Sequence, residues 1–530
     1  LGGLLVLAIG SALSITYDQG AVFYLGNFGA VAAAGVVLAY GIGSVAIAYQ
    51  GIARATALGF VYAAFGVGAA VSPAILTFFP TLIPSGDPGL PPGFTFDTTL
   101  AYVLPTVASI VALWAAYRYV PPIPGSLPAR PLLVTGVALW SLSILALVSG
   151  VLGFFGPASD QLPTVLLTGG LIGTVVLSIA FARRAGAMGS LVIDRRAVVA
   201  ALVVGVTIGF AQAVPLMLLP IVFEYPLHYG TLFAIIALAP FGLALLVAGP
   251  VTGILIQRFG PRGIMAGGTL ALGVANVATA IILAGIAGAV REFYEANPST
   301  ARVDLGAAHY ALFLILLMLI GAGFVLSTTV RTAIVFATTP RGLPGSAAAI
   351  NEASVGLGSR IGIVIATTVV TLTALASARS FTAERTAAEA DQLVAEFDDA
   401  LTTLGTPPFR EWFQATVETS EPAKLAAYAV SYIDGVTAAL LLGGLVALAG
   451  AALAWLLIGR RDPMKTVFDM QDERQMGSAT ESIVLDGQPG DRAGMAGRYC
   501  VPQVRPNRVM TALERRPMLQ LPCKEDGLDV

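Results

Sequence analysis

Residues 249–268 read Gly-Pro-Val-Thr-Gly-Ile-Leu-Ile-Gln-Arg-Phe-Gly-Pro-Arg-Gly-Ile-Met-Ala-Gly-Gly. Apolar residues lead into and out of a short centre that carries Arg258, Gly260 and Arg262. Glycine permits a tight turn between two closely packed helices, and arginine can bind the carbonyl groups left free at helix ends. The stretch therefore predicts two apolar helices joined by a short, positively charged turn.

Apolar segments of this kind recur along the whole chain before its C-terminal tail. Most are as long as the roughly 20 residues that cross about 30 Å of hydrocarbon. The twelve segments are residues 1–15, 21–49, 56–79, 98–117, 132–155, 163–182, 197–222, 230–256, 264–289, 309–338, 345–376 and 430–458. We therefore expect an all-α polytopic membrane protein.

The gaps between these segments alternate in charge. One alternating set holds almost only arginine, with Asp194 as its single acid: Arg54, Arg118, Arg130, Arg183, Arg184, Arg195, Arg196, Arg258, Arg262 and Arg341. The short gaps of the other set hold acids and no base: Asp18, Asp87, Asp97, Asp160 and Glu224. Basic residues gather in cytoplasmic loops. This pattern predicts a multi-pass membrane protein with its C-terminus in the cytoplasm. Lysine is nearly absent, which we interpret as the coding bias of a GC-rich genome, so we expect the membrane to be a bacterial inner membrane.

Composition supports the membrane assignment and argues against several other classes. Hydrophobic residues make up 56% of the 530-residue chain and charged residues 11%, against about 25% charged in an ordinary soluble domain. The mean hydropathy is +0.82. The net charge of −2 gives no reason to expect a nucleic-acid partner, and the two cysteines, Cys500 and Cys523, suggest neither disulfides nor a metal site.

Motifs for enzymatic chemistry are missing from the sequence. No lysine precedes Lys424, so the chain has no P-loop for ATP, and neither H-E-x-x-H nor G-x-S-x-G occurs. The sequence therefore predicts a protein that is not an enzyme and uses no cofactor. A chain with many spans and no ATP site is expected to draw on an ion gradient.

The stretch at residues 249–268 resembles the loop signature of the major facilitator superfamily, G-x-L-x-D-R-x-G-x-R. Gly253, Leu255, Arg258, Gly260 and Arg262 match this pattern, and Gln257 stands where the family usually has Asp. The resemblance implies a conformational loop on the cytoplasmic side. Without the Asp, the charge relay of that loop is incomplete.

Two further stretches resemble the fourteen-span drug:proton antiporters of that superfamily. Within 347–363, Glu352, Leu357, Gly358 and Gly362 match the pattern E-T-x-x-E-L-G-x-x-x-G, and Gly358 and Gly362 also form a G-x-x-x-G that is typical of close helix packing. Gly68 and Pro73 match the antiporter helix pattern G-x-x-x-G-P-x-x-G-G, whose other glycines are replaced.

The resemblance implies the major-facilitator fold, with about twelve of a probable fourteen spans in this sequence. Residues 1–120 would be four spans of the first half, so that two helices would precede residue 1; a complete twelve-span protein is the alternative. Residues 121–195 would hold the central extra helix pair, and 196–458 the six-helix second half with a loop at 377–424. Helical spacing in residues 386–401 predicts an amphipathic helix in that loop. Residues 459–530 would form a disordered cytoplasmic tail.

Buried charges are the best candidates for function. Arg331 lies ten residues before Arg341 and Glu352 eleven after it, so on a hairpin both lie at about the same depth, some 15 Å from the turn. We expect them to meet. Glu352 would take up a proton during transport, and the competing interpretation is a permanent structural ion pair.

Other polar residues are candidates for a substrate cavity or gate. Arg360 would either bind an anionic group in the cavity or pair outward with Glu224 or Asp434. Asn27 and Gln212 are buried polar residues that could contact substrate or hydrogen-bond between helices.

Three functions fit these features. The resemblance implies a proton-coupled exporter of drugs or other amphipathic molecules, a monomer whose partners are a small-molecule substrate, protons and lipid. A second hypothesis is a metabolite facilitator or proton symporter for an organic anion. A third is a membrane sensor that keeps the fold without transport.

Overall fold

The structure, a computed structural model, describes part of the chain in detail. The described residues are 1–16, 21–49, 51–82, 96–119, 195–229, 231–296, 303, 305–338, 344–381, 387–402 and 422–458, with the single residues 172, 176, 412 and 416. They belong to one compact unit, Leu1–Glu473; the second unit, Arg474–Val530, lies outside them. Apart from short connections the described residues are helical, and no strand occurs among them.

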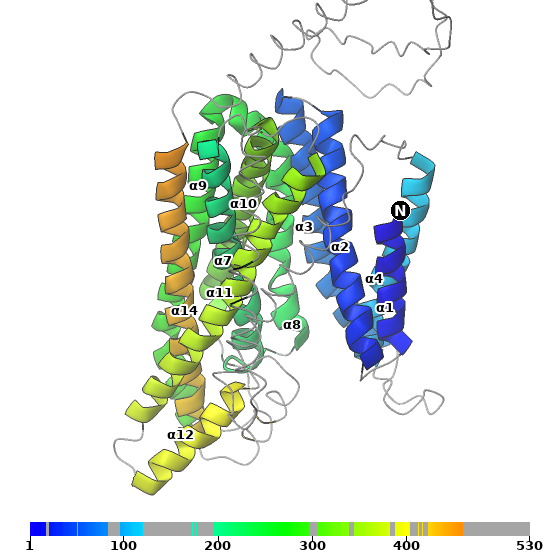
Figure 1. Ribbon diagram of the computed structural model, residues 1–530. Coiled ribbons are helices and arrows are strands. Elements are labelled where there is room, and N and C mark those ends of the chain that lie inside the picture. Colours follow the sequence, from blue (N-terminus) through cyan, green and yellow to red (C-terminus); the bar gives the residue numbers. More distant parts are fainter. Residues whose placement is uncertain are drawn as a thin grey trace, which may run out of the picture. The chain divides into compact units, whose positions relative to one another are not determined.

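Long apolar helices make up this part of the chain (Figure 1). Their bounds are α1 (Gly2–Thr16), α2 (Ala21–Ala48), α3 (Gly51–Leu82), α4 (Phe96–Tyr119), α7 (Arg195–Glu224), α8 (Thr231–Ile236), α9 (Ala239–Ala296), α10 (Gly306–Thr338), α11 (Pro344–Ser380), α12 (Ala387–Thr402) and α14 (Pro422–Leu457). Within the described residues, five of them are long and apolar enough to cross a membrane: α7, α9, α10, α11 and α14.

Helix α9 contains two helices that meet at Gly260. Its 58 residues would span about 87 Å if straight, nearly three bilayer cores. Gly260 interrupts it with φ 74° and ψ 159°, a conformation open almost only to glycine. Residues on both sides of the break, Phe241 before it and Leu272 after it, lie against neighbouring glycines of α10. The chain therefore turns back at Gly260, as the quoted stretch predicts.

The sequence prediction for residues 230–256 was wrong in one respect. It predicted one continuous helix, whereas α8 ends at Ile236 and α9 begins at Ala239. Pro240 supplies the reason, because proline lacks an N–H and disfavours helical backbone in the residue before it. The amphipathic helix predicted over 386–401 is confirmed as α12, which buries Leu393 and Phe397.

Helix α3 provides the main contact between the first four helices and the later ones, through α9. This contact is made by glycines. A Cβ on Gly66 would lie 2.5 Å from the Gly242 carbonyl oxygen, and one on Gly59 would meet the Gly249 carbonyl oxygen even more closely. Backbone therefore lies almost on backbone along this pair of helices, which brings α3 close enough for its side chains to reach α10 and α11.

The connection between α7 and α8 is a compact turn. His228 lies in it with φ 56°, and its ring is 5.8 Å from that of Tyr294. The Tyr294 hydroxyl donates a hydrogen bond to the Pro226 carbonyl oxygen at 3.0 Å. Burial lowers the pKa of His228 from its ordinary value, because the charged ring would lose solvation there.

Two predicted regions lie outside the described residues. These are the central helix pair at 132–182, of which only Ile172 and Val176 are described, and the tail at 459–530.

Candidate functional site

A buried arginine forms the centre of the polar site. Arg331 on α10 has a fully buried side chain. Its Nη1 donates to the Asn351 carbonyl oxygen at 2.5 Å and to Ser354 Oγ at 2.8 Å. Its Nη2 lies 3.4 Å from Glu352 Oε1. An arginine buried without such acceptors would be very costly, so α11 supplies both the countercharge and the oxygens that solvate the cation.

Glu352 on α11 receives donors from three residues at one oxygen. Oε1 accepts hydrogen bonds from Tyr62 Oη at 2.8 Å and from Asn351 Nδ2 at 2.8 Å, in addition to Arg331 at 3.4 Å. The Glu352 side chain keeps 18% of its surface exposed. Three donors thus converge on one carboxylate oxygen, and the side chain is not fully enclosed by the described helices.

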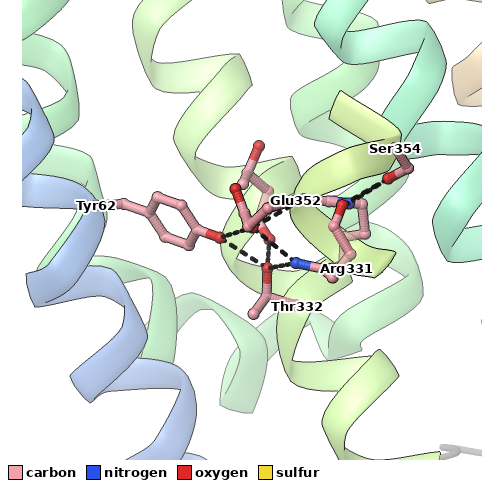
Figure 2. A network of polar contacts seen from close by, with 7 residues as sticks. Tyr62, Arg331, Thr332, Glu352 and Ser354 are labelled. Carbon is pink, nitrogen blue, oxygen red and sulfur yellow. Dashed lines mark hydrogen bonds and ion pairs between the residues drawn. The ribbon is translucent and has the colours of Figure 1, made fainter. Parts of the chain in front are cut away.

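The site joins three helices (Figure 2). Tyr62 comes from α3, Arg331 and Thr332 from α10, and Glu352 from α11. Tyr62 Oη is also 2.9 Å from Thr332 Oγ1, and Asn351 Nδ2 donates to the same Thr332 oxygen at 2.8 Å. The network therefore connects the two helices of the hairpin with each other and with α3.

Helix α7 approaches the site through a glycine. A Cβ on Gly205 would lie 2.7 Å from Arg331 Nη1 and would also collide with the Ser354 hydroxyl. Ser354 itself donates to the Asn351 carbonyl oxygen at 2.7 Å, so the glycine leaves room for a serine that both donates and accepts. Gly205 thus lets α7 cover the arginine without displacing its acceptors.

The structure brings together the two residues that the hairpin argument paired, Arg331 and Glu352. Sequence reasoning missed Tyr62, Thr332, Asn351 and Ser354. Asn351 is adjacent to Glu352, and Ser354 follows one helical turn after Asn351, so their spacing could have identified them. Tyr62 could not be found this way, because only the fold shows which side chain α3 turns toward α11.

Of the two alternatives for Arg360, the outward pairing with Glu224 or Asp434 does not form. Arg360 is exposed and makes no ion pair with any described residue. Asp434 instead accepts a hydrogen bond from Ser377 Oγ at 2.6 Å. Ser377 lies about 25 Å further along α11 than Arg360, which is beyond the reach of an arginine side chain.

Glu224 is also too far from Arg360. Ser359, next to Arg360, donates to the Gly209 carbonyl oxygen on α7 at 3.2 Å. Glu224 follows Gly209 by about 22 Å along that helix. The gate of charge pairs predicted from the sequence is therefore absent among the described residues.

The predicted cavity residue Gln212 does not join the site. Gln212 lies on α7 about 10 Å beyond Gly205, and its Oε1 is buried without a hydrogen-bond partner in the described structure. Nearby, Asn276 Nδ2 donates to the Ala211 carbonyl oxygen at 3.1 Å. Asn27 lies outside the residues whose side chains are described, as does Pro73.

The loop-signature residues surround the turn at Gly260. Gly253 lies against the Thr56 side chain of α3. The Arg258 guanidinium carbon is 5.5 Å from the centre of the Phe259 ring, and that of Arg262 is 4.1 Å from the centre of a Trp455 ring on α14. Arg262 thus attaches the start of the second half of α9 to the end of α14.

The predicted packing glycines fall into two groups. A Cβ on Gly362 would lie 2.8 Å from the Phe210 carbonyl oxygen, and one on Gly358 would overlap the Val206 backbone, so both lie in close contact with α7. A Cβ on Gly68 would meet no atom within 4 Å. The close approach of α3 lies at Gly59 and Gly66 instead.

No group of three or more metal-ligating side chains occurs within the described ranges. No model of a known protein family matches the chain, and no curated protein sequence matches it. Any function must therefore be argued from the site itself.

Proposed function

We propose that this chain is a secondary active transporter of the major facilitator type that moves a small molecule across a bacterial inner membrane in exchange for protons. The observation that carries the proposal is Glu352, a partly exposed carboxylate paired with a fully buried arginine where α3, α10 and α11 meet. Ionisable residues inside membrane spans mark ion pathways more often than they serve structure alone. Glu352 would take up and release the coupling proton.

The arrangement of the later helices supports the fold part of this proposal. Beginning at Arg195, the described chain supplies α7, the two parts of α9, α10, α11 and α14, which is six long apolar segments with the tight turn after the second. That order is the one implied by the loop signature. The glycine contact between α3 and α9 provides a surface at which two helix groups could rock against each other.

Arg331 makes the ion pair suitable for switching. Its other two acceptors, the Asn351 carbonyl and Ser354 Oγ, remain in place when Glu352 is neutral. Loss of the carboxylate charge therefore leaves Nη1 of the arginine with both of its acceptors. Proton uptake then costs the Coulomb attraction across 3.4 Å and leaves a buried cation that keeps its two neutral acceptors at Nη1.

Proton flux in inverted membrane vesicles tests the proposal. The vesicles are energised to an acidic interior, and a panel of lipophilic cations and organic anions is added while the pH gradient is followed. We expect at least one compound to dissipate the gradient with the wild-type protein and with Glu295→Gln, and not with Glu352→Gln. Glu295 is the matched control, since it forms only an exposed pair with Arg291. Compound exchange without proton movement would refute proton coupling.

Arg360 favours a second candidate, a proton symporter or facilitator for an organic anion. It is an exposed cation in an apolar helix and forms no ion pair with the described residues. In the same vesicles, an anion whose uptake follows the proton gradient and is abolished by Arg360→Gln would select this candidate. No flux of any compound would favour a sensor that does not transport.

A further inference from the structure

Tyr62 has one hydroxyl proton and two acceptors within reach. Its Oη is 2.8 Å from Glu352 Oε1 and 2.9 Å from Thr332 Oγ1. The two acceptors belong to different helices, α11 and α10. A single proton cannot make two full hydrogen bonds, so the charge on Glu352 decides which acceptor receives it.

Thr332 has the free acceptor capacity that this choice requires. Its own hydroxyl proton goes to the Thr328 carbonyl oxygen at 2.8 Å. Its oxygen accepts one hydrogen bond, from Asn351 Nδ2 at 2.8 Å. A hydroxyl oxygen has two lone pairs, so one remains for the Tyr62 proton.

The charge on the Glu352 carboxylate determines which of the two acceptors the Tyr62 hydroxyl prefers. A hydrogen bond to an ionised acceptor is about twice as strong as one between neutral groups, so ionised Glu352 holds the Tyr62 proton. Once Glu352 is neutral that advantage is lost, and its Oε1 still accepts from Asn351 and Arg331, whereas Thr332 Oγ1 has a free lone pair, so the Tyr62 proton goes to Thr332. Arg331 from α10 and Tyr62 from α3 are the ionisable side chains in contact with Glu352 within the described part of the chain; α2, α7, α12 and α14, which also pack on α11, place none there.

We infer that Tyr62 is a positioning residue that donates to Glu352 on α11 when that carboxylate is ionised and to Thr332 on α10 when it is neutral. Proton uptake thereby moves the polar attachment of α3 from one helix of the hairpin to the other. The inference rests on the proposed function in that Glu352 carries the coupling proton. It adds the means by which that proton would act on α3.

Two substitutions give opposite expectations. Tyr62→Phe removes the donor to the ionised carboxylate, which is the stronger of the two bonds, and so favours the neutral form of Glu352. Thr332→Val removes the acceptor that Tyr62 uses when Glu352 is neutral and so disfavours the neutral form. It also removes the bonds to Thr328 and from Asn351, which are present in both charge states. Thr329→Val is the matched control, because Thr329 is a fully buried neighbour on α10 whose hydroxyl has no hydrogen-bond partner among the described residues.

The measurement is the infrared carbonyl band of the protonated carboxyl group in the purified full chain, titrated from about pH 4 to about pH 10 and assigned by its loss in Glu352→Gln. We expect the midpoint to rise by about one pH unit in Tyr62→Phe and to fall by about half a unit in Thr332→Val. Thr329→Val should leave it unchanged. Shifts in the same direction, an unshifted Thr332→Val, or the absence of a band that depends on Glu352 would each overturn the inference.

This experiment does not depend on transport. Opposite shifts in a protein that carries no compound in vesicles would leave the donor exchange at Tyr62 in place and remove the proposed function. Flux that requires Glu352, combined with shifts that are not opposite, would remove only the role of Tyr62.

Discussion

Gly66→Ala tests whether the contact between α3 and α9 controls the site. A Cβ at this position would lie 2.5 Å from the Gly242 carbonyl oxygen, 2.6 Å from Leu245 Cβ and 2.8 Å from Leu246 N. Ordinary van der Waals contact begins at 3.4 Å. All three neighbours belong to the body of α9 rather than to the end of a flexible side chain, so the two helices must separate by about 0.9 Å to relieve the overlap.

The energetic cost follows from two opposing terms. Overpacking of this kind costs about 1–3 kcal/mol, whereas alanine is better than glycine in a helix by about 1 kcal/mol. Gly68→Ala, two residues further along α3, gains the helix propensity of alanine without any overpacking, because a Cβ there meets nothing within 4 Å. We therefore expect Gly66→Ala to be less stable than Gly68→Ala by about 1–3 kcal/mol.

The separation of α3 from α9 also affects the polar site at Glu352. Tyr62 precedes Gly66 by one helical turn and so lies on the same face of α3. If the displacement lies along the bond, it lengthens the 2.8 Å between Tyr62 Oη and Glu352 Oε1 to about 3.7 Å, which is outside the range of a hydrogen bond. Gly66→Ala should therefore raise the midpoint of the Glu352 carboxyl band as Tyr62→Phe does, and Gly68→Ala should not.

Equilibrium unfolding of the purified protein in mixed detergent gives the stability difference, and infrared titration gives the midpoint. Equal stability of the two alanine variants would refute the backbone contact between α3 and α9. A destabilised Gly66→Ala with an unshifted midpoint would show that α3 can separate from α9 without disturbing Glu352.

Three further predictions concern other parts of the fold. Gly260→Ala should cost about 1–3 kcal/mol, because φ 74° with ψ 159° is strained for any residue with a Cβ; an unchanged unfolding midpoint would contradict this. Arg331→Met should cost about 3 kcal/mol, near the lower end for a broken buried pair because Glu352 is partly exposed, and adding Glu352→Gln should restore part of it; strictly additive losses would mean that the pair is uncoupled. Burial lowers the pKa of His228, so the unfolded chain binds the proton more readily and wild-type stability should fall as the pH drops below about 6.5. His228→Asn, which tolerates the positive φ, should lose less stability over that range, as acid unfolding would measure.

Much of the helical fold could be predicted from the sequence, because long apolar helices are recognisable by their length and hydrophobicity. The turn at Gly260 was readable from a glycine and two arginines between apolar segments. The division between α8 and α9 was not predicted, although Pro240 marks it. The hydrophobic run continues across the break, so the count of apolar residues is the same with or without the N–H that proline lacks.

The site was predictable to the extent that it is local. Arg331 and Glu352 lie on one hairpin, so counting residues from the turn placed them at equal depth. Tyr62 lies 290 residues from Glu352, and no periodicity relates residues on helices so far apart in sequence. The alternative that paired Arg360 with Glu224 or Asp434 failed because it relied on charge complementarity and ignored the distances along α7 and α11, which are too long for a contact.

The double attachment of Arg331 to Asn351 and Ser354 has an electrical consequence. Because the arginine stays in the site whether or not Glu352 is ionised, the pair carries no net charge without the proton and one positive charge with it. In the proposed cycle, the membrane potential would therefore act on the proton-loaded rearrangement, by about 2.3 kcal/mol per 100 mV for a charge that crosses the whole field. The return of the unloaded pair would be insensitive to voltage, so the potential would drive one direction of the cycle and leave the other to diffusion.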